Sequence, residues 1–155
     1  MIMLLLQFSI AQDRYALETS QIIEVLPLVH FRPCPGAPDY IAGQFNYRGT
    51  VIPAIDLCRL MHGRPCEAKM STRIIVTSYS DTASGQHLLG LVAESMTDTI
   101  VVADKDLKPS ELDLDQSRYL GKIACDKHGM IQCIRVEYLL PADVSKRLFS
   151  AGKAD

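Results

Sequence analysis

The stretch GQFNYRGTVIPAIDL, residues 43–57, predicts a β-hairpin with a charged tip. Two apolar-rich arms, 41–47 and 50–56, flank a short turn that contains Arg48 and Gly49. Gly49 is available for the positive φ that a tight hairpin turn requires. An arginine therefore stands at the tip of the predicted hairpin, and its role is the question that this sequence raises.

The second arm of this hairpin carries two residues that constrain its surroundings. Pro53 cannot donate a ladder hydrogen bond, so it predicts an edge strand or a bulge at its position. Asp56 is a good N-cap for a short helix predicted over 57–62. Gly63 and Pro65 end that helix, because glycine favours the C-terminal cap and proline cannot continue a helix.

Most of the remaining chain consists of short apolar-rich runs bounded by turn residues, a pattern that predicts β-strands. In chain order, the predicted strands are 4–10, 15–17, 41–47, 50–56, 73–78, 88–94, 97–103, 119–126 and 130–138. Polar loops are predicted over 80–86 and 104–116, the second with one helical turn.

Short helices and one stiff connector complete the prediction. The polar pair 19–20 resembles a helix cap, and the apolar side of residues 22–26 predicts a short helix that Pro27 ends. The proline-rich segment 27–38 predicts an extended connector. A last helix is predicted from Pro141 at its first turn to about residue 150.

Two segments of the chain echo each other. YIAGQFNYRGTVIPAIDL (40–57) and YLGKIACDKHGMIQCIRV (119–136) both begin with Tyr and an aliphatic residue, place a Gly soon after, and cross a basic-Gly turn. The strands before each segment also follow the same order, which favours an internal duplication. Each unit is too small to be stable alone, so the two are expected to share one core. The predicted fold is all-β, a pair of barrels with short helices.

Composition excludes several classes of function. The chain has 155 residues, 48% of them hydrophobic and 22% charged, and a net charge of −2. Nucleic-acid binding is not expected, because basic residues are scattered and no run exceeds Lys146-Arg147. No segment approaches the ~20 apolar residues of a membrane span, and the apolar start predicts a buried strand rather than a signal peptide. A soluble, cytoplasmic protein without direct membrane insertion is expected.

The five cysteines fit the same expectation. Their number is odd and no two are spaced as a zinc-binding pair. Cys125 and Cys133 flank a predicted turn and could face each other, but free, largely buried thiols are favoured in a reducing compartment.

Catalytic motifs are absent from the sequence. It contains no nucleophile elbow, phosphate-binding loop or HExxH helix, although a Ser-His-Asp set depends on spatial proximity that the sequence leaves open. The acidic residues Glu111, Asp113 and Asp115 lack the glycine and final glutamate of a calcium loop and predict a solvated loop. No catalytic residue, cofactor or metal is predicted, so binding through loops and strand edges is the favoured function.

Two interpretations of Arg48 follow from the residues alone. A solvated turn residue is the simpler one. A binding residue is favoured by its neighbours, because Asn46, Pro53 and Asp56 lie within the same eleven positions and Pro53 leaves a strand edge unpaired.

The segment APDYIAGQFNYRGTVIPAIDLCRLM, residues 37–61, resembles the signature of CheW-like domains, the coupling proteins of bacterial chemotaxis. The motif is a Pro, then Gly43, then Asn46-Tyr47-Arg48-Gly49, and then Pro53-Ala54-Ile55-Asp56-Leu57. The resemblance continues through YALETSQIIEVL, LLGLVAESMTDTI and YLGKIACDKHGMIQCIRVEYLL, which together span nearly the whole chain. The connector LVHFRPCPG is richer in Pro and Cys than is typical, and Tyr47 replaces a more frequent aliphatic residue.

This resemblance implies one CheW-like domain over residues 1–155, built of two intertwined SH3-like β-barrels on one hydrophobic core. It implies a non-catalytic adaptor that couples the cytoplasmic tip of a chemoreceptor to a chemotaxis histidine kinase, and that reaches membrane receptor arrays only through these partners. The receptor would dock in an apolar groove between the barrels. The implied receptor-binding residues are Ile22, Glu24, Asn46, Arg48 and Gly49, with Gly43, Pro53 and Asp56 as structural residues of the motif. A small-ligand sensor or binding enzyme that uses the same groove is the alternative.

Overall fold

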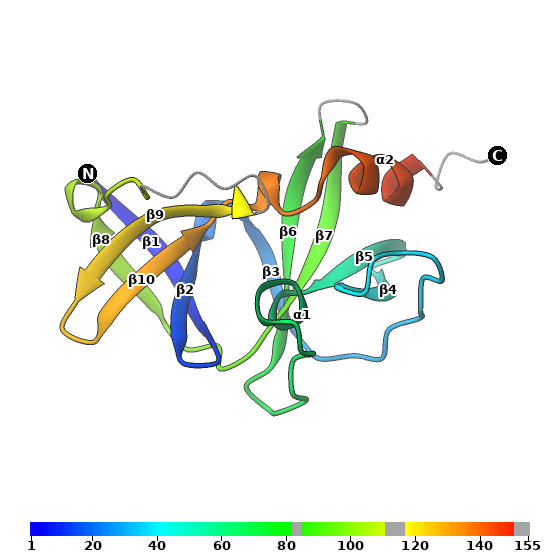
Figure 1. Ribbon diagram of the computed structural model, residues 1–155, viewed down its shortest axis with the longest axis horizontal. Helices are drawn as coiled ribbons and strands as arrows, with labels where there is room; N and C mark the ends of the chain where they lie inside the picture. Colours follow the sequence, from blue (N-terminus) through cyan, green and yellow to red (C-terminus); the bar gives the residue numbers. More distant parts are fainter. Residues whose placement is uncertain (82–84, 111–116, 151–155) are drawn as a thin grey trace.

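The computed structural model describes residues 1–81, 85–110 and 117–150, which form two five-stranded sheets side by side (Figure 1). The first sheet has the order β8-β1-β2-β10-β9, with β1 Ile2–Ile10, β2 Asp13–Glu18, β8 Thr99–Ala103, β9 Leu120–Asp126 and β10 Gly129–Ile134. The second has the order β3-β6-β7-β5-β4, with β3 Ile22–Pro27, β4 Ile41–Tyr47, β5 Thr50–Asp56, β6 Arg73–Asp81 and β7 Gly85–Ala93. No helix in these ranges is long and apolar enough to cross a membrane.

Each sheet is closed into a barrel by the segment that follows one of its edge strands. After β3, Arg32 forms an antiparallel bridge with Gln44 of β4, with both N–H to O distances 2.8 Å. After β8, Lys108 bridges Ile123 of β9 in the same way, at 2.9 and 2.8 Å. The edge strands of each sheet are thus joined, which satisfies part of the backbone that an open edge would expose.

The two halves of the chain exchange strands. The β1–β2 hairpin pairs with β8 and β10 from the second half, whereas the β6–β7 hairpin pairs with β3 and β5 from the first. The two sheets have the same arrangement: strands β8, β1, β2, β10 and β9 of the first correspond in order to β3, β6, β7, β5 and β4 of the second, each five strands away in the chain. The predicted duplication is therefore confirmed. Short parallel ladders, β2 with β10 and β5 with β7, join the hairpins.

One hydrophobic core lies between the barrels, and each barrel has a smaller interior of its own. Phe8 and Leu17 of the first sheet and Ile75 and Leu89 of the second belong to the shared cluster, each with no exposed surface. On β6, Ile75 faces this cluster while its neighbours at 74 and 76 fill the second barrel. Since successive side chains of a strand point to opposite faces, both faces of β6 are buried. The predicted pair of β-barrels that share one hydrophobic core is confirmed.

Two α-helices confirm their predictions. Helix α1, Leu57–His62, begins at Asp56, whose side chain accepts a hydrogen bond from the Arg59 N–H at 3.0 Å. It ends at Gly63, whose φ of 75° is the left-handed conformation that glycine adopts without steric cost. Helix α2 spans Ala142–Ser150, immediately after Pro141. Short 3₁₀ turns occupy Thr19–Gln21, Asp104–Asp106 and Val136–Tyr138.

Three local predictions are wrong. Residues 22–26 form strand β3 rather than a helix, because β-branched Ile and Val fit the antiparallel ladder that β6 offers. The flanks of the predicted loop 80–86 instead extend the β6–β7 hairpin to Asp81 and Gly85. The strand predicted to residue 138 ends at Ile134. The middle of the first loop and the acidic residues Glu111, Asp113 and Asp115 lie outside the described ranges.

Gly43 is required where the second barrel closes. Its φ is +145°, and a Cβ at this position would lie 2.4 Å from the carbonyl oxygen of Arg32. The closing bridge between Arg32 and Gln44 therefore depends on the missing side chain at Gly43.

We predict that Gly43→Ala lowers the free energy of unfolding by about 2–4 kcal/mol, because it combines a backbone clash with positive φ. Gly36→Ala is the matched control: Gly36 also has positive φ, at +88°, but a Cβ added there would meet no atom within 4 Å. The control should lose only about 1 kcal/mol. Urea unfolding of the three proteins measures this, and equal losses at the two sites would contradict the role assigned to Gly43.

A bidentate ion pair ties the turn between β9 and β10 to β2. Arg14 donates to the two carboxylate oxygens of Asp126 at 2.8 and 2.9 Å, and the His128 N–H donates to Asp126 at 2.8 Å. The bonds from Arg14 and then His128 hold the pKa of Asp126 well below its usual range. A carboxylate with a lowered pKa in the folded state stabilises it above the unfolded value and loses that contribution as the pH falls.

We therefore predict that stability falls more steeply in the wild type than in Asp126→Asn as the pH drops below about 4, the pKa of an unfolded Asp. Thermal melts from pH 7 to pH 2 provide the measurement. Parallel curves for the two proteins would show that this pair does not contribute to acid sensitivity.

Candidate functional site

The β4–β5 hairpin tip is a tight two-residue turn with both central residues at positive φ. Arg48 has φ of 51° and Gly49 has φ of 90°. The side-chain oxygen Oδ1 of Asn46 accepts a hydrogen bond from the Gly49 N–H at 2.8 Å and so fixes the turn. Positive φ at both positions is typical of the turns that match the twist of paired strands, but Asn or Gly usually fills the first of them. Gly49 has the predicted geometry, and Arg48 shares it at a steric cost.

Arg48 forms a three-residue cluster with Tyr47 and Glu24. Its Nη2 atom donates to Glu24 Oε1 at 2.8 Å, and the Tyr47 hydroxyl donates to the same oxygen at 2.6 Å. The guanidinium carbon also lies 5.4 Å from the centre of the Tyr47 ring. Because β3 and β4 are the two edge strands of the second sheet, the cluster is a second link between those edges, in addition to the bridge between Arg32 and Gln44.

Tyr47 and Arg48 differ sharply in exposure. Tyr47 is buried among the interior residues of the second barrel, whereas the Arg48 side chain is 73% exposed. The hydrogen bond to Glu24 raises the pKa of Tyr47, because the carboxylate favours the protonated phenol; burial acts in the same direction. The cluster therefore holds a mostly exposed cation on a buried aromatic support.

The other predicted receptor-binding residues are arranged differently. Ile22 is half-buried at the start of β3 and packs against the shared core. Along β3 the residues alternate, and the exposed ones are Ile23 at 49%, Val25 at 37%, and Pro27. Neither Ile23 nor Val25 is among the predicted site residues, because the resemblance to the family implies only Ile22 and Glu24 in this segment. No local signal identifies them, because the run Ile-Ile-Glu-Val-Leu fits a helix as well as a strand until the ladder with β6 is known.

A separate groove of about 680 Å³ lies beside α2. Its lining includes Tyr40, Tyr79, Tyr119, Tyr138 and Leu140. None of the five predicted receptor-binding residues lines it. The structure thus brings Glu24, Arg48, Asn46 and Gly49 together at the hairpin tip and places this groove elsewhere.

A protein-family model matches residues 4–144 of this chain, and its description is CheW-like domain. The chain belongs to the CheW-like domain family. It is 28% identical to the chemotaxis protein CheW of Helicobacter pylori, over 88% of this chain and 80% of that protein. It is 23% identical to the chemotaxis protein CheW of Rhizobium meliloti, over 90% of this chain and 88% of that protein. The crystal structure of the scaffolding protein TtCheW from Thermoanaerobacter tengcongensis shares the fold, with a TM-score of 0.81, 23% identity, and coverage of 93% and 96% of the two chains.

In this CheW-like chain, the other motif residues build the frame of the hairpin. Pro53 pairs with Gln44 just before β5 begins its ladder with β7 at Ala54. The first part of β5 therefore pairs with β4 alone, as Pro53 predicts, although β5 as a whole is an inner strand. Asp56 caps α1 and also accepts a hydrogen bond from the Cys66 N–H, at 3.0 Å to Oδ2.

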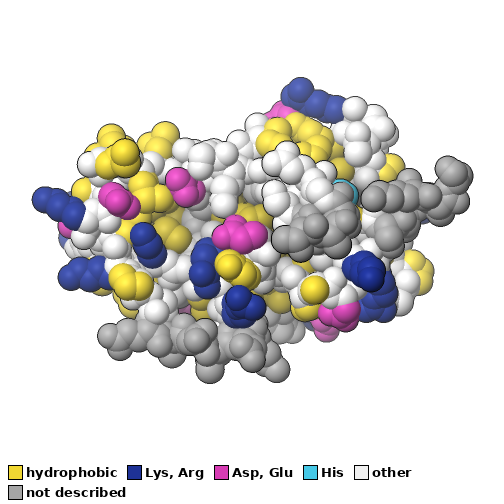
Figure 2. Space-filling view, turned by 90° about the horizontal axis from the view of Figure 1, so that it is seen from above, with side chains coloured by type: hydrophobic (Ala, Val, Ile, Leu, Met, Phe, Trp, Pro, Cys, Tyr) yellow, Lys and Arg dark blue, Asp and Glu magenta, His cyan; other side chains and the backbone are white. Residues whose placement is uncertain are grey.

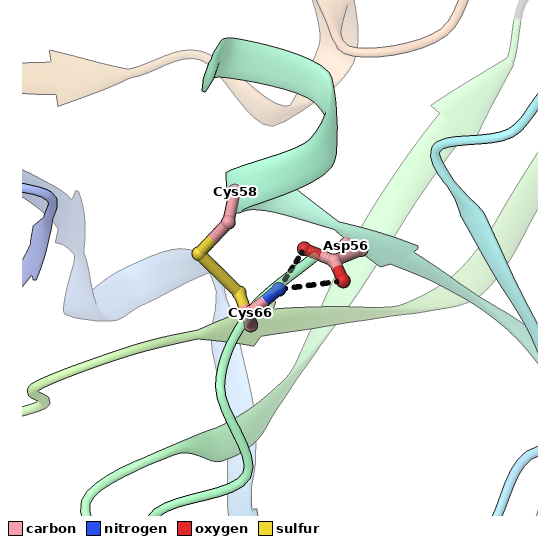
Figure 3. A group of neighbouring side chains, drawn as sticks. All are labelled: Asp56, Cys58 and Cys66. Carbon is pink, nitrogen blue, oxygen red and sulfur yellow. Dashed lines mark hydrogen bonds between the residues drawn. A yellow bond between two sulfur atoms is a disulfide. The ribbon is translucent and has the colours of Figure 1, made fainter. Parts of the chain in front are cut away.

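Next to Asp56, a disulfide joins Cys58 and Cys66 (Figure 3). The prediction of free thiols is wrong for this pair. The sequence does not indicate the bond, because neither residue lies in a recognisable cysteine pattern. Cys125 and Cys133 are free, and they do not face each other, because Cys125 is opposite Met130 and the ladder is irregular at Cys133. Cys125 is also exposed rather than buried.

Asp56 and the two disulfide cysteines, Cys58 and Cys66, are residue types that can bind a metal ion. The ligand atoms of Asp56, Cys58 and Cys66 lie within 4.8 Å of one another. In the disulfide form the sulfur atoms are bonded to each other, and both Asp56 oxygens accept backbone hydrogen bonds. This form has no thiolate to offer a metal.

We predict that Arg48→Gly changes the free energy of unfolding by less than about 1 kcal/mol, because relief of the positive φ offsets the loss of an exposed ion pair. Arg48→Val removes the same charge but places a β-branched residue at positive φ, and should lose about 2 kcal/mol more. Chemical unfolding of the two variants separates conformation from charge, and identical stabilities would show that the turn is not strained at Arg48.

Proposed function

We propose that this CheW-like protein is a non-catalytic chemotaxis adaptor that couples the cytoplasmic tip of a chemoreceptor to a chemotaxis-type histidine kinase. Family membership supports the scaffolding role. The observation that carries the proposal for the site is the hairpin tip, where Arg48 is held at positive φ, exposed and braced by Glu24. Strain that persists at an exposed charged residue is typical of functional positions.

The chemistry of Arg48 suits a helical partner. Guanidinium is a planar group with five donors, and only one bond of Arg48, to Glu24, is formed among the described residues. The remaining N–H groups belong to a side chain that is 73% exposed and can bind carboxylates or carbonyl oxygens of a docked helix. Apolar surface near this charge comes from three exposed residues: Ile23 and Val25 on β3, and Val51 on β5, which is 60% exposed. A charged centre beside apolar residues fits a protein partner.

The surface in Figure 2 agrees with protein partners rather than nucleic acid. On this face Lys and Arg side chains are interspersed with apolar and acidic ones, outside the grey residues. A nucleic-acid footprint would need a continuous basic surface.

We propose that the protein works in the cytoplasm and reaches receptor arrays through its partners, as one CheW-like domain over residues 1–155.

The alternative, a small-ligand sensor, would use the aromatic groove beside α2. The groove does not include the motif residues, so a sensor would leave the strained Arg48 turn without a role. The adaptor is therefore the better-supported function.

The test is an inversion of the Arg48–Glu24 pair. We predict that Glu24→Arg combined with Arg48→Glu keeps the internal ion pair but reverses the charge offered to the receptor. Receptor-tip affinity should fall about 10-fold or more, equivalent to ~1.4 kcal/mol or more. Each single substitution should also weaken receptor binding and should destabilise the tip by placing like charges together.

The measurement is titration calorimetry against a purified receptor tip and, separately, the kinase regulatory domain, with melting curves for all variants. Kinase binding is the internal control, because it should stay within about 2-fold of wild type in the double variant. A double variant that melts normally and binds the receptor like wild type would remove Arg48 from the site. Absence of any kinase or receptor binding by the wild type, with small-molecule binding in the groove, would favour the sensor.

A further inference from the structure

The Cys58–Cys66 disulfide fastens a surface segment to the junction between the two barrels. Cys58 lies in the first turn of α1 with no exposed surface, whereas Cys66 is partly exposed in the segment 63–72 that leads to β6. Figure 3 shows the bond crossing between these two elements, beside Asp56. A thiol in solution can therefore approach the bond from the Cys66 side but not from the Cys58 side.

The surface segment also has non-covalent anchors that do not require the disulfide. The Asp56 carboxylate accepts from the Cys66 N–H at 3.0 Å, and the nearly buried Glu94 carboxylate accepts from the Glu67 N–H at 2.6 Å. Thr72 is buried and donates through its hydroxyl to the Glu67 carbonyl. These bonds do not involve the sulfur atoms and would hold Cys66 beside Cys58 when the sulfur–sulfur bond is open, so that the pair could close again without a search.

The bond lies where a change can affect both barrels. Helix α1 contacts β5 and β7 of the second sheet and β1 of the first. Cys58 belongs to the shared core, and Cys66 packs against both that core and the interior of the second barrel. Opening the bond therefore removes a cross-link from a helix that contacts strands of both sheets.

We propose that Cys58–Cys66 is a reversible thiol–disulfide switch that responds to low-molecular-weight thiols and controls the local stability of α1 and the segment 63–72. To open it, a thiolate attacks Sγ of Cys66, forms a mixed disulfide there, and releases the Cys58 sulfur, which takes up a proton. A second thiolate attacks the mixed disulfide, releases the Cys66 thiolate and forms the small disulfide. Two small thiols are oxidised to one disulfide, and the protein disulfide is reduced to two thiols.

Closing the switch is the reverse exchange, with a small disulfide such as oxidised glutathione as the oxidant. The inference goes beyond the proposed adaptor function and does not rest on it. Its test uses only the purified chain, so its failure would leave the proposed partners unaffected.

The experiment equilibrates wild-type protein in glutathione buffers of different oxidation state. Alkylation and mass spectrometry report the state of Cys58 and Cys66, while hydrogen exchange follows peptides that cover residues 57–72. We expect both cysteines to change state together, and amides of 57–72 to exchange at least about 10-fold faster in the reduced form. We expect the melting temperature to fall by about 5–10 °C on reduction.

Two variants sharpen the result. Cys66→Ser should show the fast exchange in every buffer, and Cys125→Ser, which removes a free exposed thiol, should respond as wild type does. If Cys66→Ser does not fold, the comparison of reduced and oxidised wild type decides by itself.

Three outcomes would overturn the switch. The first is that both cysteines remain thiols in fully oxidising buffer. The second is that exchange over 57–72 is the same in both redox states. The third is that one equivalent of Zn²⁺, added to reduced and chelator-treated protein, protects both cysteines from alkylation and restores slow exchange. That result would assign Asp56, Cys58 and Cys66 to a metal site instead.

Discussion

Neither barrel of this protein can form without strands from the other half of the chain. The β1–β2 hairpin has its neighbours beyond residue 98, and the β6–β7 hairpin has its neighbours before residue 57. The strands of both hairpins, β1, β2, β6 and β7, consequently contribute buried residues to the shared core and also to the interior of one barrel. The pairings are long-range, so the free energy of the fold depends on all of them forming together. This exchange makes the protein one cooperative unit and gives the motif hairpin a rigid base.

That rigidity explains how a strained residue persists at the hairpin tip. The turn at Arg48 is held by the Asn46–Gly49 bond, by the hydroxyl of a buried Tyr47 and by Glu24 on the opposite edge strand. A free hairpin would relax the positive φ at Arg48, at a gain of about 1 kcal/mol. Here three contacts from two edges of a closed barrel outweigh that gain, and the guanidinium stays next to Glu24 and the Tyr47 ring.

The sequence predicts what short-range patterns determine. The two hairpins and the Asp56-capped helix follow from turn residues and alternation, and all are present. The strand exchange could not be predicted from periodicity, because no local pattern states which distant strand completes a ladder. Strand β3 could not be predicted either, since a polar cap before Ile and Val favours a helix until the ladder with β6 is known. The ion pair of Glu24 with Arg48 and the Cys58–Cys66 bond escape prediction for the same reason. They depend on tertiary proximity.

In the proposed receptor complex, the internal ion pair would also set the energetics of binding at the hairpin tip. A partner that had to break the Arg48–Glu24 bond would gain only the difference between two similar charge pairs. Among the described residues Arg48 forms a single hydrogen bond, to Glu24, and its side chain is 73% exposed, so a docked acceptor would add to the pair without replacing it. Because Glu24 and the Tyr47 ring already restrict the long side chain, little further rotamer entropy is lost on docking. In the proposed receptor complex, this bracing of Arg48 would lower the entropic cost of recognition, which would give a physical reason for an arginine at this turn.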